Sequence, residues 1–244
     1  KKNILEDDLS YIYRETIECD FDGANILITG CAGFLGYYIT NYFVMKAKEL
    51  NLKSVIALDS FFLRKYPSWL NDLKKDHEHI LRIEKFCVGS EPLNKIPSLD
   101  KVTHIIHMAS IASPTYYRKY PLETIDANVW GLRDLLNSAS LLKNLKNILF
   151  FSSSEIYGDP DPKNIPTSED YRGYVSCAGP RSCYDESKRF GETLCYVFRN
   201  QYNLPITIVR PFNNYGPGMN INDKRLPADL AACVIQNKDI VILS

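Results

Sequence analysis

The sequence predicts an α/β protein built on a doubly wound parallel sheet, and three observations support that prediction. Short apolar segments of strand length alternate along the chain with longer segments whose apolar residues have helical spacing. The strand segments are apolar throughout, which is typical of a sheet covered by helices on both faces. A glycine-rich turn joins the first strand segment to the first long helix.

Six strands and three long helices are expected in alternating order. The strands are expected at 25–30, 54–59, 80–88, 102–110, 147–154 and 205–211, and the helices at 34–50, 122–143 and 182–203. Residues 1–24 form an acidic, aromatic N-terminal extension that is expected to place a short helix on the main domain. The last segment, 238–244, has the composition of a strand that stops as it begins, so the region from 212 onward is expected to be truncated.

Composition and charge exclude several classes of partner. The chain has 244 residues, 45% of them apolar, and a formal net charge of zero, which disfavours nucleic acid and anionic membranes as partners. No apolar run approaches the length of a membrane span. The seven cysteines form no C-x-x-C pair and indicate thiols in a reducing compartment, which predicts a cytoplasmic protein. His104 and His107 would point to opposite faces of one strand, so no metal site is expected.

The glycine turn predicts a dinucleotide site. Gly30, Gly33 and Gly36 form G-x-x-G-x-x-G, with Phe34 and Leu35 opening the helix that follows. Gly30 permits the tight turn, Gly33 lets the backbone approach a pyrophosphate, and Gly36 lets the helix pack closely on the strand. The free N–H groups of the helix N-terminus then face the phosphates. The alternative is a glycine-rich turn with a purely structural role.

Asp59 ends the second strand segment, where a carboxylate can bind the adenosine ribose hydroxyls. A carboxylate there would repel a 2′-phosphate, and the next arginine is Arg64, so the sequence favours NAD over NADP. The alternative is that Asp59 only caps a helix or turn.

Tyr184 and Lys188 lie four residues apart on a predicted helix and therefore share a face. An ammonium close to a phenol favours the phenolate and lowers the tyrosine pKa, and an oxidised nicotinamide adds further positive charge. Tyr42 and Lys46 have the same spacing, but their helix leads away from the strand ends, so they are interpreted as a surface or core pair.

The fifth strand segment ends in serines followed by a glutamate. In a doubly wound sheet the carboxyl ends of the strands face the ligand crevice. The hydroxyl of Ser153 can therefore hydrogen-bond a reacting hydroxyl, and Glu155 adds a carboxylate to the same place. The alternative is a helix-capping turn without a catalytic role.

The glycine turn, the strand-end serine and Y-x-x-x-K, in this order, closely resemble extended short-chain dehydrogenases from about Asn25 to the last residue. The segments Met108-Ala109-Ser110 and Arg210 to Pro217 sharpen the resemblance. It implies a Rossmann-type domain over 25–211, the start of a substrate-binding region over 212–244, NAD as the cofactor, a nucleotide-sugar substrate and a homodimer built on the helices near 122–143 and 183–203.

The same resemblance implies the residue roles. Ser153 orients the sugar hydroxyl, Tyr184 is the base, and Lys188 holds the nicotinamide ribose. Ala109 and Ser110 are implied cofactor contacts, and the implied substrate contacts are Ser113, Asn213 and Arg225.

Within this family, the segment Gly179 to Arg189 is similar to the G-P-R-[AS]-C-Y-D-E-[GS]-K-R of UDP-glucuronate decarboxylases. That similarity implies C4 oxidation of UDP-glucuronate followed by decarboxylation to a UDP-pentose. Glu155 counts against a 4-epimerase, and Ser154 replaces the aspartate that many 4,6-dehydratases use as an acid. The 4-epimerase and 4,6-dehydratase reactions nevertheless stay open as alternatives. GDP-mannose-type dehydratases carry Thr-Ser-Glu at this strand end, so Ser154 does not exclude a dehydratase.

Departures from the pattern are Cys87 for an acidic residue, Ile111 for proline, Ser153 for threonine and Gly218 for arginine. A different class, a nucleotide-binding scaffold without turnover, stays open because fold does not dictate function. The intact Ser153, Tyr184 and Lys188 argue against that class.

Overall fold

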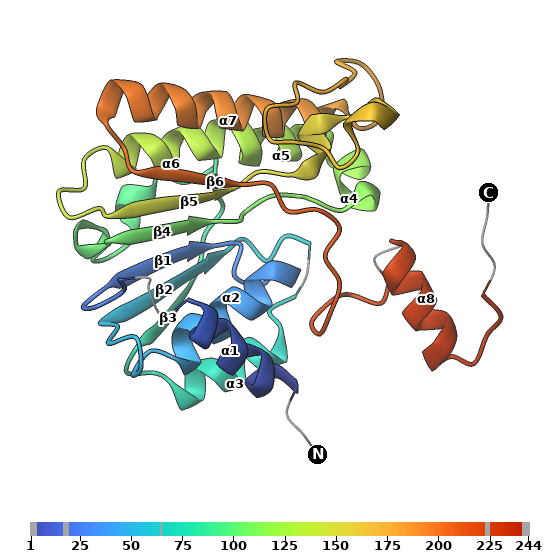
Figure 1. Cartoon of the computed structure of the whole chain (residues 1–244). Helices are drawn as coiled ribbons and strands as arrows, with labels where there is room; N and C mark the ends of the chain where they lie inside the picture. The colour runs from blue at the N-terminus through green and yellow to red at the C-terminus, as the bar shows by residue number, and fades with distance from the viewer. Residues whose placement is uncertain (1–3, 17–19, 64, 223–224, 241–244) are drawn as a thin grey trace.

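The computed structural model describes residues 4–16, 20–63, 65–222 and 225–240. Its centre is a parallel six-stranded sheet in the order β3-β2-β1-β4-β5-β6, which confirms the predicted doubly wound architecture (Figure 1). The strands are β1 Asn25–Thr29, β2 Ser54–Asp59, β3 Leu81–Lys85, β4 His104–His107, β5 Asn147–Phe151 and β6 Ile206–Val209. Each lies inside the range that its apolar segment predicted.

Helices cover both faces of this sheet (Figure 1). They are α1 Ile4–Glu15, α2 Phe34–Met45, α3 Ser68–Asp76, α4 Pro114–Lys119, α5 Pro121–Ile125, the π-helix η3 Asp126–Gly131, α6 Leu132–Ala139, α7 Ser182–Tyr202 and α8 Leu226–Ile235. Short 3-10 turns are η1 Leu93–Lys95, η2 Leu99–Lys101, η4 Ser154–Tyr157 and η5 Pro162–Asn164.

Two apolar cores lie on the two faces of the sheet, because successive strand residues point to opposite sides. Leu27 of β1 packs in the core that contains the buried residues of α6 and α7. Ile26 and Ile28 pack in the other core, with the buried residues of α1, α2 and α3. Each such fully buried side chain contributes about 1.5–3 kcal/mol relative to an exposed one.

The helix at the N-terminus was expected, and Leu9 of α1 is only 1% exposed in the core beside α2. Helices α3, α4 and α8 were not predicted. Residues 238–240 belong to no helix or strand, so the structure shows no strand there, and 241–244 lie outside the described residues, as do Cys19 and Arg64.

The single helix predicted over 122–143 is wrong in detail. The helical run is interrupted by η3 and ends at Ala139. A Cβ added to Gly131 would lie 2.4 Å from Cγ1 of Val88, and one added to Gly89 would lie 2.9 Å from the carbonyl oxygen of Asp126. The loop after β3 therefore packs closely against the helical run at the π-helical segment η3. Apolar periodicity in the sequence does not reveal such a tertiary contact.

The order of strands reverses between β1 and β4. From β1 the chain continues to β2 and β3 on one side of the sheet, and from β4 it continues to β5 and β6 on the other side. In such sheets ligands bind beyond the carboxyl ends of the strands at this point. The segments that leave β1, β4, β5 and β6 at that edge are the glycine turn, 108–113, 152–155 and 210–214. Most of the predicted site residues lie in these segments, whereas Asp59, Tyr184, Lys188 and Arg225 lie elsewhere.

Candidate active site

The glycine turn has the geometry that its sequence predicted. Gly30 has φ +77, and a Cβ there would lie 2.8 Å from the backbone nitrogen of Ala109. A Cβ on Gly36 would lie 2.3 Å from the carbonyl oxygen of Gly30, so α2 meets the turn too closely for any side chain. Gly33 is the N-cap of α2, whose free N–H groups start at Phe34. The turn thus presents bare backbone and a positive helix end to the crevice.

Asp59 holds the glycine turn against the end of β2. Its carboxylate accepts hydrogen bonds from the backbone N–H of Ala32 at 3.0 Å and of Phe61 at 2.8 Å. The turn-capping bonds of the alternative interpretation are therefore present. Asp59 also lines a cavity with Phe86 and Cys87, so capping and ribose recognition are compatible at this position.

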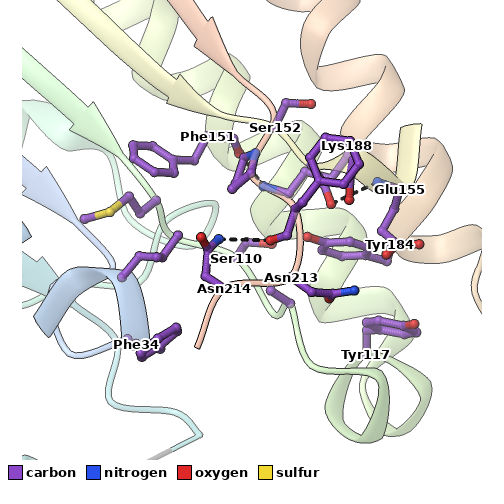
Figure 2. A pocket seen from close by; sticks show the side chains of 18 of the residues that line it. Phe34, Ser110, Tyr117, Phe151, Ser152, Glu155, Tyr184, Lys188, Asn213 and Asn214 are labelled. Carbon is purple, nitrogen blue, oxygen red and sulfur yellow. Dashed lines mark hydrogen bonds between the residues drawn. The ribbon is translucent and has the colours of Figure 1, made fainter. Parts of the chain in front are cut away.

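Tyr184 and Lys188 are both buried on α7 and face the crevice (Figure 2). The Lys188 ammonium donates to the carbonyl oxygen of Phe151 at 2.8 Å and lies 5.9 Å from the centre of the Tyr184 ring. Burial lowers the pKa of Lys188 to about 7. Burial also raises the pKa of Tyr184 to about 12, although its hydrogen bond with Ser153 acts in the opposite direction.

In the protein alone the pKa of Tyr184 is raised rather than lowered, which differs from the expectation for its pairing with Lys188. Desolvation penalises the phenolate more than the neighbouring groups favour it. The ammonium is also directed to the Phe151 carbonyl rather than to the phenol. A phenolate near neutral pH needs positive charge from a bound ligand.

Glu155 lies in an ion-pair network beside Tyr184. Ser153 caps η4 by accepting a hydrogen bond from the Glu155 N–H at 3.2 Å. The Glu155 carboxylate is paired with the guanidinium of Arg181, which also contacts Asp185 at 3.3 Å. Arg181 was not predicted as a site residue, although it precedes Tyr184 by three residues in the matched segment.

Two further residues near Tyr184 were missed. Tyr117 of α4 stacks on the Tyr184 ring with centroids 5.1 Å apart and planes 10° apart. Asn128, in η3, donates to the Ser187 hydroxyl at 2.9 Å, and Ser187 donates to the Tyr184 carbonyl oxygen at 2.9 Å. Both contacts depend on helical segments whose form the sequence pattern does not reveal.

Two adjoining cavities meet at the glycine turn. The first, about 330 Å³, runs from the turn to α7, and the second, about 430 Å³, runs from the turn to the ends of β2 and β3. Predicted residues in the first are Gly30, Gly33, Phe34, Leu35, Gly36, Ser110, Ser153, Glu155, Tyr184, Lys188, Asn213 and Arg225. Predicted residues in the second are Gly30, Gly33, Phe34, Asp59, Ala109, Ser110, Ser113 and Arg225.

The polar atoms of these cavities fit a polar ligand. The hydroxyls of Ser110, Ser113, Tyr117 and Ser152 are buried without a hydrogen-bond partner in the protein. Such groups cost about 1–3 kcal/mol each unless a ligand or water satisfies them. A dinucleotide laid across both cavities, with its pyrophosphate at the glycine turn, would meet the backbone N–H groups of α2 and these hydroxyls.

The second tyrosine–lysine pair lies elsewhere. Tyr42 is only 5% exposed, and its hydroxyl is 2.6 Å from Oγ1 of Thr16, just after α1. Lys46 pairs with Glu49 at 3.2 Å. Neither residue lines either cavity, so of the two interpretations left open, the core one is correct for Tyr42.

His107 bonds Oγ1 of Thr29 at 2.7 Å, whereas His104 packs near Phe21 in the opposite core. Among residues 4–16, 20–63, 65–222 and 225–240, no three His, Cys, Asp or Glu side chains are grouped so as to hold a metal ion. None of the helices in these ranges is long and apolar enough to cross a membrane.

The strand order, the glycine turn and the cavities at the carboxyl ends define a Rossmann-type dinucleotide-binding protein. The sequence model of the NAD dependent epimerase/dehydratase family matches residues 26–244, and the chain belongs to that family. The predicted cofactor, NAD, is the one that the family's description gives.

Curated relatives are named UDP-glucuronic acid decarboxylases. The one from Xenopus tropicalis is 34% identical over 221 residues, which cover 91% of this chain and 48% of that protein. UDP-glucuronic acid decarboxylase 5 from Arabidopsis thaliana is 36% identical over 217 residues, which cover 89% of this chain and 59% of that protein. The chain thus spans about half the length of the curated relatives it matches.

Solved structures confirm the fold. UDP-N-acetylglucosamine 4-epimerase from Methanobrevibacter ruminantium, in complex with UDP-N-acetylmuramic acid, has 25% identity and a TM-score of 0.76, and the match covers 91% of this chain and 66% of that one. UDP-glucuronic acid 4-epimerase from Bacillus cereus, in complex with NAD, has 23% identity and a TM-score of 0.72. The match covers 90% of this chain and 65% of that one.

Proposed function

We propose that the protein decarboxylates UDP-glucuronate to a UDP-pentose through NAD-dependent oxidation at C4 of the sugar. The observation that carries the proposal is the Glu155–Arg181 ion pair in the first cavity, where Glu155 lies near Tyr184 (Figure 2 labels both). It places an acid–base group and a carboxylate-binding cation next to the candidate base. The decarboxylase-like segment Gly179 to Arg189 and the names of the curated relatives support the same reaction.

The glycine turn, Asp59 and Lys188 would hold NAD+ across the two cavities. The chemistry that the bound cofactor would supply is reversible hydride acceptance from the sugar C4, which leaves it recycled. Its positive nicotinamide ring would offset the burial that keeps the pKa of Tyr184 at about 12. Tyr184 could then take the proton of the C4 hydroxyl, while Ser153 orients that hydroxyl through the hydrogen bond it shares with the phenol.

Lys188 and Tyr117 hold the base in place. The Lys188 ammonium is anchored on the Phe151 carbonyl, from where its remaining protons can reach a ribose hydroxyl. The stacked ring of Tyr117 fixes the plane of the phenol.

Oxidation at C4 makes the sugar a β-keto acid, whose C5–C6 bond breaks when the electrons move into the C4 carbonyl. Arg181 is the cation that can bind the substrate carboxylate, since its guanidinium lies at the cavity and can exchange Glu155 for that group. Glu155, released from Arg181, would then take up a proton from solvent and pass it to C5 as the enolate collapses. These roles concern residues that line the first cavity.

The other reactions of the family fit this site less well. A 4,6-dehydratase needs an acid for the departing water, and Ser154 offers only a hydroxyl where many such enzymes have aspartate. A 4-epimerase has no step that uses the Glu155–Arg181 pair. A scaffold without turnover does not account for the assembly of Ser153, Tyr184 and Lys188 around one cavity.

We also place the protein in the cytoplasm. The six cysteines within the described part of the chain are free thiols, which suits a reducing compartment.

Glu155→Gln tests the decarboxylation step. The amide keeps the shape of the side chain but cannot donate the proton, so C4 oxidation should outrun the later steps. Reduced cofactor, absorbing near ~340 nm, should then accumulate with UDP-glucuronate. Glu186→Gln is the matched control, because Glu186 lies on α7 outside both cavities and pairs only weakly with Arg189 at 4.0 Å. Normal turnover by Glu155→Gln would remove Glu155 from the mechanism.

A further inference from the structure

The N-terminal helix contacts α2 next to the site. Asp8 of α1 accepts a hydrogen bond from the hydroxyl of Tyr38 at 2.9 Å. Burial, and then this bond to Asp8, raise the pKa of Tyr38 to about 12, so the phenol remains a donor at neutral pH. The bond therefore joins two segments that lie thirty residues apart in the sequence.

Tyr37 and Tyr38 also lie close to the segment 216–218, which follows β6. A Cβ added to Gly216 would lie 3.7 Å from the Tyr38 hydroxyl oxygen. A Cβ on Gly218 would lie 2.7 Å from Cδ1 of Tyr37, and Gly218 has φ +84. The backbone at Gly218 therefore packs closely against the Tyr37 ring, whereas Gly216 lies near the Tyr38 hydroxyl. Gly218 stands where the resembled family has an arginine.

This aromatic support is itself fixed. The rings of Tyr37 and Tyr38 meet edge to face with centroids 5.6 Å apart, and Tyr37 meets Trp69 of α3 in the same way at 5.0 Å. The amide of Asn41 donates to the Tyr37 carbonyl oxygen at 2.7 Å. Perpendicular aromatic contacts of this kind favour one arrangement of the rings.

We propose that Asp8 and Tyr38 are positioning residues for the substrate side of the site. The segment that rests on Tyr37 and Tyr38 connects Asn213 to Arg225, and both of these line the first cavity. Asp8 holds Tyr38, Tyr38 packs edge to face on Tyr37, and Tyr37 supports the backbone at Gly218, in the segment that follows Asn213. The inference rests on the proposed function only for the chemistry of the ligand, the UDP part of a nucleotide sugar.

Titration calorimetry with UDP and, separately, with NAD+ tests this in the full chain. Asp8→Ala and Tyr38→Phe should each raise the Kd for UDP about 3- to 10-fold, which is the loss of one hydrogen bond, and leave the Kd for NAD+ within about twofold. Asp8→Asn keeps a side-chain oxygen that can accept from the phenol and should restore most of the UDP affinity.

Thr16→Val is the matched control. It removes a second hydrogen bond between the α1 region and α2, which joins Thr16 to Tyr42. Tyr42 is not among the neighbours of Gly216 or Gly218. Hydrogen exchange of the amides of 212–218 should speed up in Tyr38→Phe but not in Thr16→Val, and thermal unfolding checks that each variant is folded. An equal loss of UDP affinity in Thr16→Val, or an unchanged Kd in Tyr38→Phe, would overturn the inference.

The inference and the proposed function can fail separately. UDP binding with the expected split between variants, but without carbon dioxide release from UDP-glucuronate, would contradict only the reaction. Decarboxylation without the split would contradict only the positioning role. If UDP does not bind the unaltered chain, both are overturned.

Discussion

Two tyrosine–lysine pairs with the same spacing have different surroundings in this protein. Tyr184 faces a cavity next to Ser153, whereas Tyr42 lies in the core and bonds Thr16. Helical spacing places the two side chains of each pair on one face and says nothing of what that face meets. The position of each helix in the doubly wound order is what separates the pairs.

Lys188 gives a prediction at the residue scale. Its pKa falls from 10.5 to about 7 on folding, so between these values the unfolded chain binds more protons than the native protein. The contribution of Lys188 to the free energy of unfolding therefore increases as the pH rises from about 7 to 10.5. Below about pH 7 the buried side chain is charged, and its desolvation destabilises the folded state most.

Lys188→Met lacks this group, so its stability relative to the unaltered protein should fall as the pH rises from about 7 to about 10. Urea unfolding at the two pH values measures the difference. A difference that does not change with pH would mean that Lys188 is not desolvated as described.

The predicted site residues line the two cavities, and most of them follow strands whose carboxyl ends meet at one edge. The sequence did not reveal the contacts of Tyr117, Arg181 and Asn128. Tyr117 reaches Tyr184 from α4, and Asn128 reaches Ser187 from η3. Arg181 was visible in the matched segment, but its partner Glu155 lies 26 residues earlier in the chain.

At the scale of elements, strands were easier to predict than helices. All six strands are short apolar segments bounded by polar ones, so the local sequence pattern is enough to recognise them. Helix α4 is only six residues long, and the π-helix η3 depends on the close approach of Gly131 to Val88. Neither feature leaves a periodic signal in the sequence.

The connection between β1 and α2 can be tested with two glycines. In Gly36→Ala the new Cβ would overlap the backbone oxygen of Gly30, which no side-chain movement relieves, so the variant should lose about 1–3 kcal/mol of stability. Gly33 has φ −70, and a Cβ there would lie 3.3 Å from the same oxygen. Gly33→Ala should therefore stay folded and lose NAD+ affinity.

Thermal unfolding and NAD+ titration of both variants separate the two roles. A Gly36→Ala protein as stable as the unaltered one would contradict the close packing. A Gly33→Ala protein with unchanged NAD+ affinity would contradict the pyrophosphate site at this turn.

At the scale of the whole molecule, α5 and η3 pack beside α7, and the face that these elements form carries exposed apolar side chains. Leu122 is 71% exposed, Trp130 51%, Phe190 47% and Tyr196 64%. We expect this face to form a homodimer, as the sequence predicted, because burial of such side chains is favourable.

Light scattering of the full chain at micromolar concentration should give twice the monomer mass. Tyr196→Glu, which places a charge on this face, should shift the mass towards the monomer. A monomer mass for the unaltered protein would show that the face has another partner or none.

The central claim is that Tyr184 starts the NAD-dependent decarboxylation of a UDP-glucuronate. It is tested most directly by incubating the full chain with UDP-glucuronate and NAD+ and following the loss of carbon dioxide from the nucleotide sugar by mass spectrometry. Tyr184→Phe keeps the ring and its stacking on Tyr117 but has no ionisable oxygen, so conversion should slow by about 10²–10⁴-fold with NAD+ binding retained. Tyr42→Phe loses the bond to Thr16, which lies away from both cavities, and should convert within about a few-fold of the unaltered protein, since a lost hydrogen bond far from the site affects stability by about 1 kcal/mol. Conversion by Tyr184→Phe at the rate of Tyr42→Phe, or no loss of carbon dioxide in the unaltered protein, would contradict the account.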